Sequence, residues 1–190
     1  MEWLIPALAL PVLVLMTAVH RRLSALRREI DPAWVELDHA LRKRHGLVTS
    51  LLEAVRRHAP KETKLLDGAA QARAKATLAD LAPEAHAKAE QALTVALDRV
   101  IGLAEARPAL QEDPRFKRMT DSLAKANEAI ELAIEAFNGR VLAYADAKRH
   151  GLALVMAKYF LFRDVEFFVA DKAAREAAQA GLGPTFWTRA

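Results

Sequence analysis

The acidic and histidine side chains of residues 36–39 (Glu-Leu-Asp-His) carry the most suggestive chemistry in the sequence. Helical bundles hold di-iron and di-manganese centres with Glu-x-x-His pairs, one pair from each of two helices. Here the motif occurs once, and helical periodicity places Glu36 and His39 away from the apolar stripe around them. His39, His45 and His58 are not spaced to share one metal on one face. We therefore predict no catalytic, cofactor-binding or metal-binding residue here, and a surface position for Glu36 and His39.

Arg44 is the one charged residue that falls inside an apolar stripe. At 100° per residue, the stripe from Trp34 to Val55 occupies one helix face, and Arg44 lies within it. A long basic side chain can pack its aliphatic stem on apolar surface while its charged head reaches a polar partner. We predict that the Arg44 guanidinium reaches a carboxylate or the end of the bundle; the alternative is that Arg44 belongs to an interaction surface.

A cluster of aromatic residues lies near the C-terminus, within ten positions of one another. It is too interrupted by charged residues to span a membrane. Two interpretations remain open: the segment docks on the helical bundle and closes its end, or it binds a partner or a membrane surface. The aromatic residues of this second candidate surface are Tyr159, Phe160, Phe162, Phe167 and Phe168.

The composition excludes several classes of function. The chain contains no cysteine, so disulfide scaffolds, thiolate metal sites and cysteine nucleophiles are ruled out. It contains no glycine-rich phosphate loop, nucleophile elbow or His-Glu-x-x-His motif. Only 7 glycines and 8 prolines interrupt 190 residues that are rich in Ala, Leu, Glu, Lys and Arg, which is typical of long helices. The sequence predicts an all-α protein that is not an enzyme.

The N-terminal segment is uncharged from residue 3 to residue 19. Such a stretch is at the short end of the length that spans a bilayer as a helix. We predict a membrane anchor that contacts the lipid bilayer through residues 3–19. A cleavable signal peptide is one alternative, although the charge order is reversed from that of a signal peptide. A helix buried in a soluble core is the other.

A basic flank follows the predicted anchor and consists of Arg21, Arg22, Arg27 and Arg28. Excess positive charge marks the cytoplasmic side of a membrane helix, so we predict a single-pass protein of the cell membrane with its N-terminus outside. The flank also suits contact with anionic headgroups. We predict no nucleic-acid binding, because the basic residues lie on several helix faces without interleaved aromatic side chains.

The remaining pattern predicts an antiparallel up-down four-helix bundle with an extra C-terminal helical segment. Asp31-Pro32 reads as the N-cap and first residue of the first bundle helix, or as a kink in a helix continuous with the anchor. Further helices are predicted over about 61–80, 84–106 and 115–149, with the C-terminal segment over 152–180. The domains would be an anchor with its flank (1–22), the bundle (23–150) and the aromatic-rich segment (151–190).

The chain resembles the LemA family in several short stretches that follow the family's order over roughly residues 20–168. The stretches are Ala33-Trp34 with Leu37-Asp38 and Leu41-Arg42-Lys43-Arg44, Arg99 with residues 103–110, Asn127-Glu128 with Phe137-Asn138 and Tyr144, and the aromatic ranges 157–162 and 166–168. The sequence departs from the family at Val48-Thr49-Ser50-Leu51, at Arg107 before Pro108, and at Phe137. The resemblance implies a single-pass, N-out membrane protein with a cytoplasmic helical bundle, and it supplies no catalytic residues.

Together these observations predict a membrane-anchored, non-enzymatic helical bundle that presents a cytoplasmic interaction or scaffold surface. Its partners would be the bilayer, one or more unknown proteins, and a second copy of the chain through self-association. The alternative is a lipid-binding or metal-binding bundle at the membrane face.

Overall fold

The computed structural model describes residues 4–78, 81–149 and 151–169, with side chains described from residue 10 onward in these ranges. All regular secondary structure in these ranges is helical. The elements in chain order are α1 (Leu4–His58), α2 (Thr63–Ala76), α3 (Pro83–Glu105), α4 (Pro108–Gln111), α5 (Pro114–Arg149) and α6 (Gly151–Tyr159). The prediction of an all-α chain is confirmed.

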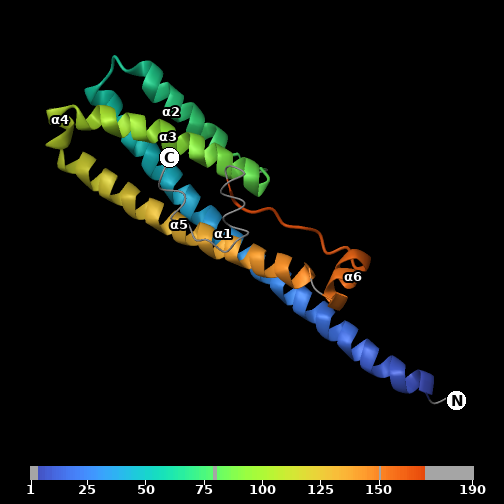
Figure 1. Cartoon of the computed structure of the whole chain (residues 1–190). Helices are drawn as coiled ribbons and strands as arrows, with labels where there is room; N and C mark the ends of the chain where they lie inside the picture. The colour runs from blue at the N-terminus through green and yellow to red at the C-terminus, as the bar shows by residue number, and fades with distance from the viewer. Residues whose placement is uncertain (1–3, 79–80, 150, 170–190) are drawn as a thin grey trace.

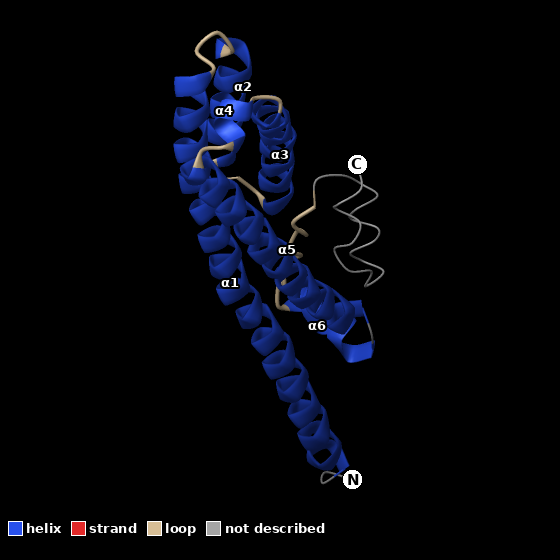
Figure 2. Cartoon of the chain, turned by 90° about the vertical axis from the view of Figure 1, so that its left-hand side faces the viewer, coloured by secondary structure: helices blue, strands red, loops and turns tan. Residues whose placement is uncertain are grey.

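The helices run alternately up and down, with α1 and α5 as the long antiparallel pair (Figure 1). The α2–α3 hairpin packs on the half of α1 that ends at His58. Prolines begin α3, α4 and α5, where the missing N–H is not needed and the fixed φ suits the first helical turn. The bundle is therefore uneven, because α1 extends far beyond the other helices toward the N-terminus (Figure 2).

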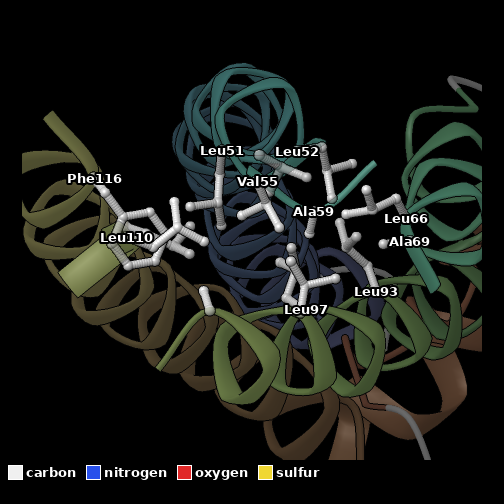
Figure 3. Close-up of a cluster of buried hydrophobic side chains, with 14 of the residues drawn as sticks. Leu51, Leu52, Val55, Ala59, Leu66, Ala69, Leu93, Leu97, Leu110 and Phe116 are labelled. Atoms are coloured by element: carbon white, nitrogen blue, oxygen red, sulfur yellow. The ribbon is translucent and has the colours of Figure 1, made fainter. Parts of the chain in front are cut away.

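Two apolar clusters form the core. The distal cluster joins α1, α2, α3, α4 and the start of α5, and its side chains converge on the end of α1 (Figure 3). The central cluster joins the middle of α1 to the second half of α5 and to residues 167–169. Members of the distal cluster include Val48, Leu51, Val55, Leu66, Leu93, Leu97, Leu110 and Phe116. Members of the central cluster include Ile30, Leu37, Leu41, Ile130, Phe137, Val141, Tyr144 and Phe168.

Of the two interpretations of Asp31-Pro32, the start of a bundle helix is wrong, and a helix continuous with the preceding segment is confirmed, because α1 continues through both residues. Ile30 and Ala33 on either side are buried in the central cluster, so the packed stripe is continuous. Pro32 itself is exposed. Proline has no N–H to donate, so one helical hydrogen bond is missing there. Asp31 does not cap a helix; it accepts a hydrogen bond from Arg27, one turn earlier, at 2.6 Å.

The predicted transmembrane helix is not supported by the described part of the chain. Among the described residues, no helix contains a stretch long and apolar enough to cross a membrane. The predicted anchor is described only in part, since residue 3 and the side chains of residues 4–9 lie outside the described set. Within that set, the domain boundary predicted at residue 22 is not a break in structure, because α1 runs through it.

The C-terminal segment is helical for a shorter distance than predicted. Helix α6 ends at Tyr159, residues 160–169 form no helix, and residues 170–190 lie outside the described set. The Phe162 N–H donates to the Ala157 carbonyl at 3.0 Å, and Leu161 has φ of 55°. This is the Schellman arrangement that closes a helix, with leucine at the left-handed position that glycine usually takes. A side chain there costs about 1 kcal/mol of backbone strain.

Candidate functional site

A layer of polar side chains separates the two apolar clusters. On α1 it falls between Leu41 of the central cluster and Val48 of the distal cluster. On α3 it centres on Glu90, between Ala87 and Leu93, and on α5 it falls between Leu123 and Ile130, so three helices contribute. We call this the polar layer; it comprises Arg44, His45, His86, Glu90, Thr94 and Asn127.

An ion pair between Arg44 and Glu90 is the centre of the polar layer. Both side chains are almost completely buried, with 5% and 4% exposed. The Arg44 guanidinium also donates to Thr94 Oγ1 at 3.2 Å and reaches Asn127 Oδ1 at 3.5 Å. Thr94 in turn donates to the Glu90 main-chain carbonyl at 3.0 Å. The sequence prediction that Arg44 packs in the stripe and reaches a carboxylate describes this arrangement.

Two histidines face the other oxygen of the same carboxylate. His45 Nε2 lies 2.6 Å from Glu90 Oε1, and His86 Nε2 lies 3.6 Å from that oxygen. The main-chain carbonyl of His45 accepts a hydrogen bond from Arg73 Nε at 2.9 Å. The polar layer therefore connects α1 to α2 as well as to α3 and α5.

The electrostatics keep Glu90 ionised. Burial acts to raise the pKa of Glu90, but the hydrogen bond from His45, the His86 imidazole and the Arg44 charge outweigh it and lower the pKa to about 2. A carboxylate this weakly basic is a poor proton acceptor near neutral pH, where an effective general base has a pKa close to the working pH. The polar layer is therefore suited to fixing the register of the helices and poorly suited to acid–base catalysis.

A pocket of about 330 Å³ lies beside the polar layer, between α3 and α5. Leu41, Ile130 and Phe168 supply apolar wall, while Arg44 and Glu90 are at its polar end. This volume is in the range of small-molecule sites. Within the described ranges, no three acidic or histidine side chains are arranged to hold a metal ion. The Arg44 guanidinium beside Glu90 would also repel a cation at that carboxylate.

The segment after α6 is attached to α5 by polar contacts that the sequence did not indicate. The Asn138 side chain donates to the Phe168 carbonyl at 3.2 Å and accepts from the Phe168 N–H at 2.8 Å. The Tyr144 hydroxyl donates to the Arg163 carbonyl at 3.1 Å, and Lys148 pairs with Asp164. We call residues 162–169 the strap, since they follow the bundle and cover part of the central cluster.

The predicted aromatic surface divides into two parts. Phe167 and Phe168 are buried in the central cluster, and Phe162 is half-buried against it. Tyr159 and Phe160 are exposed. The segment therefore docks on the bundle through its strap and leaves the end of α6 uncovered.

The predicted basic flank lies on the outside of α1. Arg21, Arg22 and Arg28 are exposed, while Arg27 is half-buried and paired with Asp31. The flank and Arg44 are far apart along α1, so the structure does not gather the predicted residues into one site.

The Glu-x-x-His motif of residues 36–39 is on the surface, as predicted: Glu36 and His39 are both exposed. The residues that sequence reasoning missed are His45, His86, Glu90 and Asn138. A signal for one of them was present, because Glu90 precedes Leu93 and Leu97 by three and seven positions and therefore shares their buried face.

Comparison with known proteins gives a family and no individual relative. No curated protein matches the chain. The model of the LemA family matches residues 33–180, which is more than half of the chain and includes the whole polar layer and the strap. This protein therefore belongs to the LemA family.

Proposed function

We propose that this protein is a membrane-anchored, non-enzymatic helical bundle that presents an interaction surface at the cytoplasmic face. The observation that carries the proposal is the N-terminal extension of α1. Residues 10–15 are exposed on every side of the helix, and all of them are apolar. In Figure 2, α1 continues past α6 with no other described helix beside it.

An exposed helix that is apolar all round is unfavourable in water. Leu10, Leu13 and Val14 are 65%, 59% and 59% exposed. Transfer of apolar surface out of water contributes about 25 cal/mol for each Å² removed. Hydrocarbon lipid is a medium in which a helix with no polar face is favourable, because its backbone groups are already paired. The sequence is uncharged from residue 3 to residue 19.

The orientation follows from the basic residues. His20-Arg21-Arg22 comes directly after the uncharged stretch, Arg27 and Arg28 follow within nine positions, and Glu2 is the one charged residue before it. Positive charge is retained on the cytoplasmic side of membrane helices. The bundle, which follows the flank, would then lie in the cytoplasm with the N-terminus outside.

The polar layer supports a non-enzymatic role. Its carboxylate is held ionised by Arg44 and His45 and is too acidic to accept a proton efficiently at neutral pH. Its contacts join α1, α2, α3 and α5. We infer that the bundle is a rigid support for surfaces that bind a partner protein or a second copy of the chain.

Membrane fractionation with matched charge substitutions tests the anchor. We expect the full chain to remain in the membrane after an alkaline carbonate wash, and Leu13→Glu combined with Val14→Glu to release it. Val35→Glu is the control, because Val35 is an exposed apolar residue of α1, 64% exposed, outside the predicted anchor. Extraction of the unsubstituted chain by carbonate would refute the anchor.

Protease protection in intact cells tests the orientation. A tag placed after the last residue should resist protease that is added outside the cells. The same tag should be cleaved once the membrane is permeabilised. Cleavage without opening would place the bundle outside and refute the cytoplasmic assignment.

A further inference from the structure

The end of α6 presents a second apolar surface, separate from the extension of α1. We call it the tip patch; it consists of Leu154, Val155, Tyr159, Phe160 and Leu161. Tyr159 and Leu161 are each 81% exposed, and the other three are 50–59% exposed. A contiguous exposed patch of large apolar side chains marks a binding surface more often than chance exposure does.

The backbone at the tip patch is strained at one of its exposed residues. Leu161 occupies the left-handed position of the turn that ends α6, with φ of 55°. Glycine would close the same turn without strain. Strained residues of this kind persist where the surrounding structure holds them and are concentrated at functional sites.

The tip patch lies level with the end of the predicted anchor. The His20 ring is 5.1 Å from the Phe160 ring and 5.5 Å from the Phe162 ring, measured between centroids. His20 follows directly after the uncharged residues 3–19. Figure 1 shows α6 beside α1 at the part of the bundle from which the N-terminal extension projects.

The charges around the tip patch are mainly positive. Lys158 and Arg163 adjoin it in sequence, and Arg21 and Arg22 follow His20 on α1; all four are exposed. The acidic groups nearby are Asp164, which pairs with Lys148, and the exposed Glu166. Apolar and aromatic side chains with basic residues next to them in sequence and on the adjoining part of α1 fit an anionic lipid interface, where tyrosine and phenylalanine enter the headgroup region and basic groups meet phosphate.

We propose that the tip patch inserts into the headgroup region of the same bilayer that holds the anchor, as a second membrane contact. The inference rests on the proposed function, since it is the anchor that brings the patch to the membrane surface. The anchor and the tip patch together would fix the orientation of the bundle relative to the membrane plane. A single anchor helix would leave that orientation free to vary. The proposed ligand of the tip patch is therefore lipid. The test below distinguishes this from a protein that covers the patch.

Fluorescence quenching by labelled lipids tests the position of the patch in the full chain. Because the chain has no cysteine, Leu154→Cys, Leu13→Cys and Val35→Cys each give one labelling site. The labelled proteins are reconstituted into vesicles of phosphatidylcholine and phosphatidylglycerol that carry a quencher in the headgroup or deep in the acyl chain. We expect the label at position 154 to be quenched by the headgroup quencher and the label at 13 by the deep one. The label at 35 should be quenched by neither.

The pattern of quenching separates the two proposals. Loss of quenching at 13 refutes the anchor. Quenching at 13 without quenching at 154 leaves the anchor intact and overturns the second contact; a protein ligand for the patch would give this result.

A second set of variants keeps the test independent of misfolding. Tyr159→Ser combined with Leu161→Gly removes two apolar side chains and relieves the left-handed strain, so helical content should be kept. In the Leu154→Cys background, we expect this pair to abolish headgroup quenching. Val35→Ser with Leu132→Ser removes exposed apolar side chains elsewhere, at 64% and 67% exposure, and should leave the quenching unchanged. Equal quenching in both pairs would overturn the proposal.

Discussion

Helix α1 contains two regions of opposite character. Its N-terminal extension, residues 10–15, is entirely apolar and is exposed on all sides. Its second region, from Leu23 to Val55, carries many charged residues, yet Leu37, Leu41 and Val48 there have no exposed surface. The difference shows that burial in this fold follows the spacing of apolar residues and not their density. A helix with one apolar stripe can bury that stripe against neighbouring helices. A helix that is apolar on all sides needs an apolar environment on all sides.

The largest expected effect comes from the polar layer within the buried region. Glu90→Ala removes the counter-charge of Arg44, which remains buried, and should lower the free energy of unfolding by about 3–5 kcal/mol. Chemical denaturation followed by circular dichroism measures the loss. Glu53→Ala, an exposed carboxylate on α1, is the control and should change stability by less than about 0.5 kcal/mol. Equal effects of the two substitutions would mean that the polar layer contributes nothing specific.

The two regions of α1 can be compared directly with one type of substitution. Leu41→Ala leaves a cavity in the central cluster and should cost about 2–5 kcal/mol of unfolding free energy. Leu13→Ala removes the same atoms from an exposed position and should change bundle stability by less than about 0.5 kcal/mol. Denaturation in one buffer measures both. A large loss from Leu13→Ala would show that the extension packs against the bundle.

The strap covers the buried region, and its attachment gives a smaller effect. Asn138→Ala leaves the Phe168 N–H and carbonyl without their partners and should cost about 1–3 kcal/mol. Hydrogen exchange should accelerate at the Phe168 amide, because this amide donates to Asn138. Exchange along residues 48–55 should change much less, since these residues belong to the distal cluster. Uniform acceleration throughout the chain would contradict local release of the strap.

The polar layer also predicts that the free energy of unfolding depends on pH under acidic conditions but not near neutral pH. The pKa of Glu90 is about 2 in the folded protein, against an ordinary value of 4.5, because Arg44, His45 and His86 face its carboxylate. Its contribution to stability is therefore complete above about pH 4.5 and is lost as pH falls toward 2. Glu90→Gln should flatten this part of the curve of unfolding free energy against pH. Glu135→Gln, an exposed group on α5, should leave the slope unchanged, and equal slopes would refute the assignment.

Much of the fold was predictable, because apolar residues recur at helical spacing within each helix. On α5, Leu123, Ile130, Phe137 and Val141 recur at helical spacing, and all four are buried. The helix-start signal at Pro32 failed because residues on both sides of it pack in the central cluster while Pro32 itself is exposed. Periodicity failed after Tyr159, where a helix was predicted. The segment is held instead by contacts with residues distant in sequence, such as the hydrogen bond from the Phe168 N–H to Asn138.

The candidate site was less predictable, since its partners lie on different helices. Arg44 stood out because a charge interrupts an apolar stripe, and the sequence predicted that its guanidinium reaches a carboxylate or the end of the bundle. To identify Glu90 as the partner, one must know how α3 aligns against α1, because Arg44 and Glu90 are 46 positions apart in the sequence. Asn138 stood out only within the family resemblance, and its role was not predicted because its partners are main-chain atoms of the strap.

The uninterrupted course of α1 sets a distance scale for the molecule. A helix rises about 1.5 Å per residue, so Arg44 lies about 38 Å and His58 about 58 Å from Val19 along the axis. If Val19 marks the edge of the bilayer, the pocket between α3 and α5 is beyond the reach of lipid headgroups. A ligand for that pocket would have to be a soluble molecule, or part of a protein that projects equally far from the membrane. Under the proposed anchoring, the length of α1 would therefore separate the part of the surface near the bilayer from the part that contains the pocket.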